Sequence, residues 1–354
     1  MTLRFGVVGT GFASRVQLPA LTQHPHTEVI SVCSRTHQNA EQAAARFEIP
    51  HWTSRYEELL DQEPDAVVIT TPTLQHAHMA ISAAKRGIHV LCEKPMAMTA
   101  DEAKEMVDAA KTAGILGAID FEFRYLPARA WLTQLLADGF VGEPRMVHLH
   151  QFTDKRADSA SPWTWWSDAS QGGGALGAMA SHHLDALMLW NGPVIGTSGA
   201  LATLIKERPA QREQRTVTSD DTFSFQIQFE NGALGTLTTS TAVWHPEPLT
   251  ITLFGSKGTL KLVDDRDVFG GKQDEPLRQF PIPPALFELP EGCSAAKEGT
   301  SYWLEAPFLR LLDDFVRSIR TGVPYRGPTF DDGLKVQRVL DAVRRSDARG
   351  PTDI

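Results

Sequence analysis

The sequence predicts an α/β chain of two domains, a doubly wound parallel sheet followed by an α+β domain with an open, mostly antiparallel sheet. The length of 354 residues is typical of two domains. Apolar strands alternate with helical segments up to about residue 120, whereas strands follow one another directly from about 193 to 264. We therefore expect a first domain of residues 1–122 and a second domain of residues 123–354.

The expected strands of the first domain are continuous apolar runs: "RFGVVGTG", "EVISVCSR", "DAVVITTP", "GIHVLCEKP" and "GILGAID". Because they do not alternate with polar residues, both faces of their sheet must be covered, which is typical of parallel strands. Helical segments separate them: "NAEQAAARF", "QHAHMAISAAKRG" and "TADEAKEMVDAAKTAG". The last has Thr99 as a candidate N-cap and Glu102 three residues later, which is a capping-box pattern.

The second domain begins with an amphipathic helix after Pro127 and an alternating strand, "PRMVHLHQF". A tryptophan-rich loop and the helix "GGGALGAMASHHLDALMLW" follow, and then come the strands "VIGTSGALATL", "TFSFQIQF", "ALGTLTTSTAV", "LTITLFG" and "GTLKLV". Turns between these strands favour antiparallel pairing, with helices on one face of the sheet. Residues 266 to 300 show no clear period, and two helices are expected at roughly 303–320 and 330–346.

Composition excludes several classes of partner. The net charge of −9 argues against nucleic acid or an anionic membrane, and no apolar run is long enough to span a bilayer. The N-terminus is interpreted directly as a first strand, without a leader. The cysteines are odd in number and far apart, which predicts reduced thiols in the cytoplasm, and no spacing of ligands indicates a metal.

The first strand ends in "GTGFAS", a turn that suits a dinucleotide. Gly9 permits a tight turn, and Gly11 lets the backbone approach a pyrophosphate. Ser14 is small enough for close packing of helix on strand, and Phe12 lies within the same turn. The alternative is a strand-to-helix turn without a ligand. The position after the first strand of an alternating series favours the dinucleotide and a Rossmann sheet.

The end of the second strand bears on the choice of cofactor. NAD sites usually place a carboxylate there for the ribose 2′-hydroxyl, whereas a 2′-phosphate prefers a cation and hydroxyls. This chain has Ser34, Arg35 and Thr36 and no carboxylate. We therefore expect NADP(H) to be favoured over NAD(H). The alternative is that Arg35 stacks on the adenine or points to solvent.

Three segments together resemble a known family. "GTGFAS", "TTPTLQHAHMAISAAKRGIHVLCEKPMAMT" and "GGGALGAMASHHLDAL" are similar to the glucose–fructose oxidoreductase/inositol dehydrogenase/rhizopine catabolism (Gfo/Idh/MocA) family. The resemblance spans nearly the whole chain. It implies a nicotinamide-dependent enzyme acting on sugars, cyclic polyols or their keto forms. It also implies a C-terminal sheet with the substrate site on one side and often a neighbouring subunit on the other.

The Glu-Lys-Pro element explains why an apolar strand runs into charged residues. Lys94 follows a parallel strand at its carboxyl end, where such sheets bind ligands. An ammonium group there can stabilise and protonate the oxygen on a carbon that gains or loses hydride. The resemblance implies that Pro95 fixes the chain, through a cis bond that X-Pro permits at low cost, and that Glu93 holds the cofactor or orients Lys94. The alternative is a solvated charge pair at a strand end.

The resemblance assigns further residues to the cofactor and the substrate. His76 corresponds to a histidine near the nicotinamide, and Thr71 and Pro72 shape its loop. Arg124 and Tyr125 correspond to a segment that enters the cleft, although an exposed arginine before a helix is an equal alternative. For the tryptophan-rich loop that contains Trp165, anchoring the loop in a subunit contact is favoured over stacking on a sugar.

The helix of "GGGALGAMASHHLDAL" departs from the family pattern. Regular α-helical spacing would place Ala178, His182 and Asp185 on one stripe. The family has a carboxylate where this chain has Ala178, whereas His182 and Asp185 fit. We expect Lys94 and His182 to be the catalytic residues, with Lys94 carrying most of the proton transfer. His183, the neighbour, is expected in a core or surface role.

We therefore predict an NAD(P)-dependent dehydrogenase or reductase of a sugar-like compound. The alternatives are an NAD-dependent glycosidase that oxidises its substrate transiently, and an NAD(P)-binding regulator without catalysis. Because the antiparallel sheet has two faces to cover and helices for one, we expect a homodimer or homotetramer.

Overall fold

The structure is a computed structural model that describes residues 2–295 and 300–348. It divides the chain into two compact units. The first contains residues 1–126 and 288–334, and the second contains residues 127–287 and 335–354. The chain first passes from one unit to the other between residues 126 and 127, close to the expected boundary at residue 122. The return of residues 288–334 to the first unit was not expected.

The first unit is built on a six-stranded sheet in the order β3-β2-β1-β4-β5-β6. Every neighbouring pair is parallel, and this order is that of the doubly wound Rossmann sheet. The strands are β1 (Leu3–Val8), β2 (Thr27–Cys33), β3 (His51–Thr53), β4 (Ala66–Ile69), β5 (His89–Cys92) and β6 (Gly117–Ile119). The edge strand β3 was not predicted, because it is three residues long and two of them are exposed.

Helices cover this sheet and complete its core. They are α1 (Gln17–Gln23), α2 (His37–Phe47), α3 (Tyr56–Leu60), α4 (His76–Lys85), α5 (Ala100–Ala113) and α8 (Thr300–Thr321). Phe308, Leu312 and Phe315 of α8 belong to the same buried cluster as Phe5 and Val7 of β1. The apolar stripe of α8 therefore explains why residues so late in the chain belong to the first unit.

The predicted cap of α5 is present with one difference. Thr99 Oγ1 accepts a hydrogen bond from the Glu102 backbone N–H at 3.2 Å. The Glu102 carboxylate accepts from the Met98 N–H at 2.9 Å, whereas a capping box would have it accept from the cap residue itself.

The second unit is built on an eight-stranded sheet in the order β16-β15-β14-β13-β7-β12-β11-β8. Its strands are β7 (Pro144–Phe152), β8 (Val194–Ala202), β11 (Thr222–Phe229), β12 (Leu234–Ser240), β13 (Thr250–Gly255), β14 (Gly258–Val263), β15 (Asp267–Lys272) and β16 (Arg278–Phe280). The pairing is antiparallel except between β7 and β12, which are parallel. Strands β15 and β16 lie where no period was recognised.

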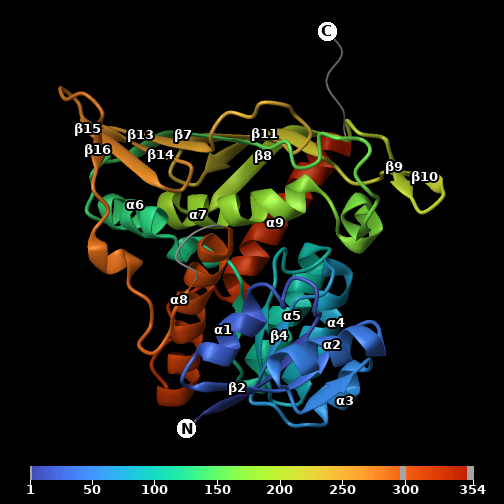
Figure 1. Cartoon of the computed structure of the whole chain (residues 1–354). Coiled ribbons are helices and arrows are strands. Elements are labelled where there is room, and N and C mark those ends of the chain that lie inside the picture. Colours follow the sequence, from blue (N-terminus) through green and yellow to red (C-terminus); the bar gives the residue numbers. More distant parts are fainter. Residues whose placement is uncertain (1, 296–299, 349–354) are drawn as a thin grey trace. The chain divides into compact units, whose positions relative to one another are not determined.

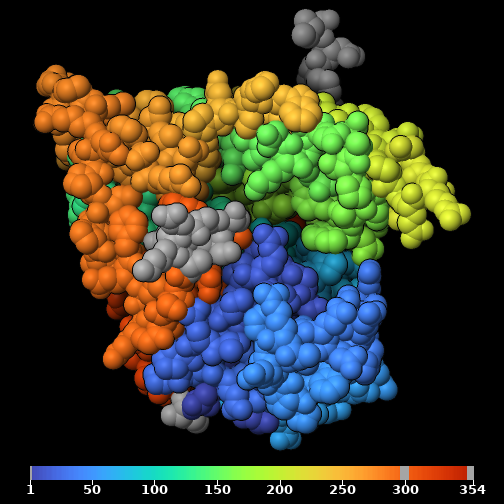
Figure 2. Space-filling view, in the orientation of Figure 1, coloured from blue at the N-terminus to red at the C-terminus, as the bar shows by residue number. Residues whose placement is uncertain are grey.

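A separate hairpin of β9 (Glu207–Ala210) and β10 (Glu213–Thr216) projects from this unit, in yellow in Figure 2. Helices α6 (Pro127–Ala137) and α7 (Ser181–Asn191) lie along one face of the eight-stranded sheet, as expected (Figure 1). Helix α9 (Phe330–Ala348) follows α8. Along β11, Phe223, Phe225 and Ile227 are buried while Ser224 and Gln226 are exposed, so the other face of the sheet is open.

Within residues 2–295 and 300–348, no helix is both long enough and apolar enough to cross a membrane.

Candidate functional site

The glycine turn after β1 has the geometry of a dinucleotide cradle. Gly9 has a φ of +91°, and a Cβ there would lie 2.5 Å from the Thr70 carbonyl oxygen, so only glycine fits. A Cβ on Gly11 would meet nothing within 4 Å. The backbone of Gly11 is therefore open to close approach by a pyrophosphate, at the point where the strand order of the sheet reverses.

Contacts of Ser14 and Phe12 with neighbouring residues stabilise the rest of this turn. The Ser14 hydroxyl donates to the Thr10 carbonyl oxygen at 2.6 Å, and Phe12 packs against the buried core. Residues 11–16 form turns before α1 begins at Gln17. Ser14 therefore holds the shape of the turn, in addition to being small enough for close packing.

The end of β2 presents hydroxyl groups and a guanidinium. Ser34 is buried, and its hydroxyl lies 2.8 Å from that of Thr10 in the glycine turn. Arg35 is exposed, and among residues 2–295 and 300–348 no carboxylate forms an ion pair with it. Thr36 caps α2 by accepting from the Asn39 N–H at 3.2 Å. The segment from Ser34 to Thr36 thus combines a hydroxyl beside the glycine turn with an accessible cation.

Lys94 lies two residues after the end of β5, and β5 pairs with β4 in the sheet. The peptide bond between Lys94 and Pro95 is cis, as the family resemblance implied. The carboxylate of Glu93 accepts from the Lys94 backbone N–H at 3.2 Å and from Gln17 Nε2 at 2.8 Å. Glu93 therefore orients the segment that carries the lysine.

His76 links the loops that follow β4 and β5. It is buried, with Nε2 2.8 Å from the Thr71 carbonyl oxygen and Nδ1 3.0 Å from the Pro95 carbonyl oxygen. Burial lowers its pKa. Both ring nitrogens therefore face the protein backbone, and His76 positions the loop of Thr71 and Pro72 against the segment of Lys94.

A group of buried carboxyls beside Lys94 was missed by sequence reasoning. Asp120 follows β6 and Glu122 lies two residues later, and both are buried. Gln17 Nε2 donates to Asp120 Oδ2 at 3.1 Å as well as to Glu93. The signal was available, because Asp120 stands at the carboxyl end of an expected parallel strand, as Lys94 does.

The carboxyl groups of Glu93, Asp120 and Glu122 have raised pKa values. Burial raises the pKa of Glu93 and raises that of Asp120 well above its usual range. Burial, with a contribution from the charge of Glu93, raises the pKa of Glu122 to about 8. Lys94 opposes these shifts in all three groups. Titratable residues perturbed in this way and gathered at one strand edge are typical of functional sites.

Arg124 and Tyr125, expected at the substrate, have partners within the first unit. The Tyr125 hydroxyl donates to Asp314 of α8 at 2.8 Å. Arg124 Nη2 lies 3.4 Å from the Asp332 carboxylate near the start of α9. Tyr125 therefore has a structural contact, and a substrate role for either residue stays a prediction.

The helix that carries His182 is not a regular α-helix throughout. Leu176–Ala180 is a π-helical segment, and α7 begins only at Ser181. The expected stripe from Ala178 to His182 therefore crosses from a π-helical turn into an α-helix, and a shared face for the two residues stays a prediction. His182 and Asp185 both lie in α7 and are both buried.

Asp220 supports the start of this segment. Its Oδ2 accepts from the Leu176 N–H at 2.6 Å, and burial raises its pKa to about 6. His183 has the core role that was expected. Its Nε2 lies 2.7 Å from Gln151 Oε1, and its Nδ1 lies 3.3 Å from Nη2 of the buried Arg129.

The tryptophan-rich loop is held by cations of its own unit. The guanidinium of Arg215 lies 3.5 Å from the ring centroid of Trp163, and that of Arg156 lies 4.1 Å from the ring of Trp166. Trp165 is 46% exposed. Two of the tryptophans therefore anchor the loop, while Trp165 presents its ring to the surroundings.

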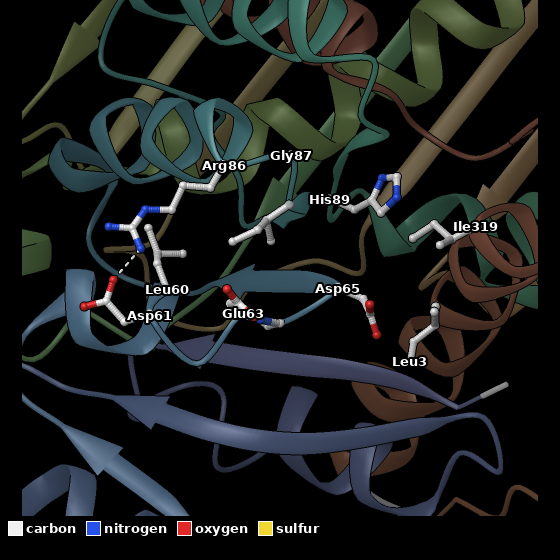
Figure 3. A pocket seen from close by; sticks show the side chains of 11 residues that line it. Leu3, Leu60, Asp61, Glu63, Asp65, Arg86, Gly87, His89 and Ile319 are labelled. Carbon is white, nitrogen blue, oxygen red and sulfur yellow. Dashed lines mark hydrogen bonds and ion pairs between the residues drawn. The ribbon is translucent and has the colours of Figure 1, made fainter.

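The first unit has a hollow of about 600 Å³ whose lining does not include Lys94. Figure 3 shows residues that line it. It is lined by residues such as Leu3, Asp65 and His89, which lie at or just before the amino ends of strands. Arg86 in its wall pairs with Asp61. Ligands of doubly wound sheets bind at the carboxyl ends instead, so we place the site at Gly9 and Lys94. Residues 2–295 and 300–348 contain no group of three or more His, Cys, Asp or Glu side chains placed to hold a metal ion.

Comparisons with known proteins agree with this geometry. Residues 3–121 match the oxidoreductase family with an NAD-binding Rossmann fold, and residues 130–261 match the GFO/IDH/MocA C-terminal domain. A solved oxidoreductase domain protein from Kribbella flavida is 31% identical with a TM-score of 0.89, covering 99% of this chain and 98% of that one. The chain belongs to the Gfo/Idh/MocA oxidoreductase family.

Other relatives of this family member bind or act on sugars. Levoglucosan dehydrogenase of Pseudarthrobacter phenanthrenivorans is 28% identical, over 98% of this chain and 96% of that protein. A solved levoglucosan dehydrogenase in complex with NADH and L-sorbose has a TM-score of 0.88 and 28% identity, covering 99% of this chain and 98% of that one. The chain is thus an NAD(P)-dependent oxidoreductase.

Proposed function

We propose that this oxidoreductase transfers hydride between a nicotinamide cofactor and a hydroxyl-bearing or carbonyl carbon of a sugar or cyclic polyol. The observation that carries the proposal is the position of Lys94 just past the carboxyl end of β5. Strand β5 pairs with β4, which pairs with β1, and Thr70 and Gly9 directly follow these two strands. The names of the relatives that bind levoglucosan and L-sorbose support the substrate class.

The residues of the first unit fit the cofactor. Gly9 and Gly11 would receive the pyrophosphate, Ser34 and Arg35 the adenosine ribose, and the loop of Thr71 the nicotinamide half. The cofactor supplies or accepts the hydride. Lys94 donates the proton to the substrate oxygen in reduction and accepts it in oxidation. We assign His182 an auxiliary role in binding or proton transfer, with Asp185 and Trp165 as substrate candidates.

Absorbance of the nicotinamide tests the reaction. Levoglucosan and a panel of pyranoses and inositols are incubated with NAD⁺ or NADP⁺, and L-sorbose with the reduced forms. A dehydrogenase gives net change with at least one compound, and Lys94→Ala abolishes it, whereas the exposed Lys104→Ala does not. Hydrolysis of a glycoside without net change would favour the transient-oxidation glycosidase. Cofactor binding without either reaction would favour the regulator.

We further propose a preference for NADP(H) over NAD(H). Ser34, Arg35 and Thr36 provide hydroxyls and a guanidinium, and the segment carries no carboxylate to bind the 2′-hydroxyl of NAD. The solved relative holds NADH, so the affinities for the two cofactors must be compared directly.

We also propose that the chain forms a homodimer or homotetramer. The open face of the eight-stranded sheet supports this, because it exposes Met146, Leu234 and Phe254 on adjacent strands.

We further propose a reducing, cytoplasmic location. It is supported by the three cysteines, Cys33, Cys92 and Cys293, because all of them are free thiols.

A further inference from the structure

The carboxyl cluster consists of the buried Asp120 and Glu122 and the half-buried Glu93. Its members come from three points of the first unit: the end of β5, the end of β6 and the turn that follows. Gln17, which is fully buried, donates from one amide nitrogen to both Glu93 and Asp120. Burying ionised carboxylates in this way is strongly unfavourable unless a proton or a positive charge compensates them.

The arrangement of the cluster favours a bound proton. The Glu93 and Asp120 carboxyls accept hydrogen bonds from the same Gln17 nitrogen, at 2.8 and 3.1 Å, so these two groups lie close together. An ionised carboxylate is only an acceptor, so a bond between two carboxyl groups needs a proton on one of them. Gln17 occupies Asp120 Oδ2, and no N–H or O–H donor of the described residues reaches Oδ1. A buried carboxyl oxygen that no donor reaches is the oxygen on which the group carries its own proton, so Asp120 Oδ1 is the site for the proton of the cluster.

The charged group that faces the cluster is Lys94. It acts electrostatically on all three carboxyls, and its own backbone N–H binds Glu93. Among the described residues, the buried thiol of Cys92 and the phenol of Tyr325 also interact electrostatically with the cluster. Burial raises the pKa of both groups, so they remain neutral near pH 7. The groups that can exchange a proton here are therefore Lys94 and the carboxyls.

We propose that Glu93, Asp120 and Glu122 form a proton store that resets Lys94 after each hydride transfer. The inference rests on the proposed function. In oxidation the substrate O–H bond breaks, Lys94 Nζ gains that proton, and the hydride leaves the carbon with its electron pair. An Nζ–H bond of Lys94 then breaks, and a carboxylate oxygen of the cluster gains the proton. Before the next turnover a carboxyl O–H bond of the half-buried Glu93 breaks and its proton passes to water, so the cluster returns to its starting state. In reduction each proton step runs in reverse.

The shared proton is tested without a substrate, by infrared spectroscopy of the full chain with NADPH bound. The store predicts a protonated-carboxyl C=O band that persists at about pH 7, where ordinary Asp and Glu are ionised. The band is lost or shifted in Asp120→Asn and Glu122→Gln and kept in Glu305→Gln, a buried glutamate of α8 that binds Gln23. Lys94→Met moves its titration to higher pH, because a nearby positive charge is removed. A band that is absent at pH 7, or unmoved by Lys94→Met, overturns the proposal.

Kinetics separate a proton store from a scaffold. With levoglucosan as substrate, Glu122→Gln should leave single-turnover hydride transfer within about twofold of wild type but lower the steady-state rate by about tenfold or more. Added small buffer acids should restore the steady-state rate, because they can exchange the proton with Lys94 directly. Equal loss in both measurements, or no loss in either, overturns the store. A wild-type chain inert toward every sugar would instead count against the proposed function, and the infrared result would still decide whether the cluster shares its proton with Lys94.

Discussion

Arg35 is the residue on which the cofactor preference depends. It is exposed, beside the buried Ser34 at the end of β2. Replacing Arg35 by Asp should move the preference toward NADH, because a carboxylate repels a 2′-phosphate and accepts from a free 2′-hydroxyl. Fluorescence titration of both reduced cofactors measures the change. A wild-type chain that binds NADH as tightly as NADPH contradicts the preference.

Two glycines of the same turn should respond differently to alanine. Gly9→Ala forces a side chain at a φ of +91° and against the Thr70 carbonyl, so it should destabilise the first unit by about 1–3 kcal/mol. Gly11→Ala has open space for its Cβ. It should leave the unfolding free energy near that of wild type and weaken NADPH binding. Denaturant unfolding and cofactor titration of the two variants measure both effects, and equal destabilisation would contradict the assignment.

At the residue scale, positions at the ends of predicted strands could be derived from the sequence. Gly9, Ser34 and Lys94 could be placed from sequence because each follows an apolar run that had to be a parallel strand. Gln17 and Glu122 could not, because nothing in a linear pattern shows that a helix start and a turn meet the end of β5. The assignment of His76 to the cofactor stays a prediction, and the contacts of its two ring nitrogens with backbone carbonyls could not be predicted from the sequence.

At the scale of elements, the start of the π-helical segment depends on the ionisation of Asp220. Its folded-state pKa of about 6 is raised by burial, with Asp221 also raising it and Arg344 lowering it. A raised carboxyl pKa means that the folded state holds the proton more tightly. The contribution of Asp220 to the free energy of unfolding is therefore fully present below the unfolded pKa of about 4. It is lost as the pH rises through the folded pKa of about 6.

Asp220→Asn should remove this pH dependence. Between about pH 4 and pH 6 the wild type should lose up to about 3 kcal/mol relative to the variant. Chemical unfolding at several pH values measures the difference, with Asp108→Asn on the exposed face of α5 as the control. A wild-type stability that rises relative to Asp220→Asn over this range would show that the ionised carboxylate is the favoured form.

Whole elements were predicted where their hydrophobic period was long and missed where it was short. Continuous runs identified β1, β2, β4 and β5, and the alternation of "TFSFQIQF" identified β11. The π-helical segment was not predicted, because a sequence that is apolar on most positions fits either helix. The stripe of α8 predicted a helix but not the core that it completes, because any apolar stripe can pack on either domain.

At the scale of the whole molecule, the open face of the eight-stranded sheet predicts self-association. Met146 of β7 pairs with Leu234 of β12 and Phe254 of β13, and all three side chains are exposed. Such a patch is typical of an interface. The double change Met146→Asp and Phe254→Asp should convert a dimer or tetramer into a smaller species, since charges would be buried unpaired. Light scattering measures the mass, with Leu204→Asp as an exposed control outside this cluster. A wild-type monomer at micromolar concentration contradicts the prediction.

The central claim for the molecule is that Lys94 transfers the proton that accompanies the hydride. Single-turnover stopped-flow absorbance of the nicotinamide, with a reactive sugar and saturating cofactor, tests it most directly in Lys94→Ala and His182→Ala. We predict that Lys94→Ala loses about a hundredfold or more in the rate of hydride transfer, that His182→Ala loses far less, and that both variants keep cofactor affinity near that of wild type. A larger loss in His182→Ala would assign the proton to the histidine and contradict the role given to Lys94.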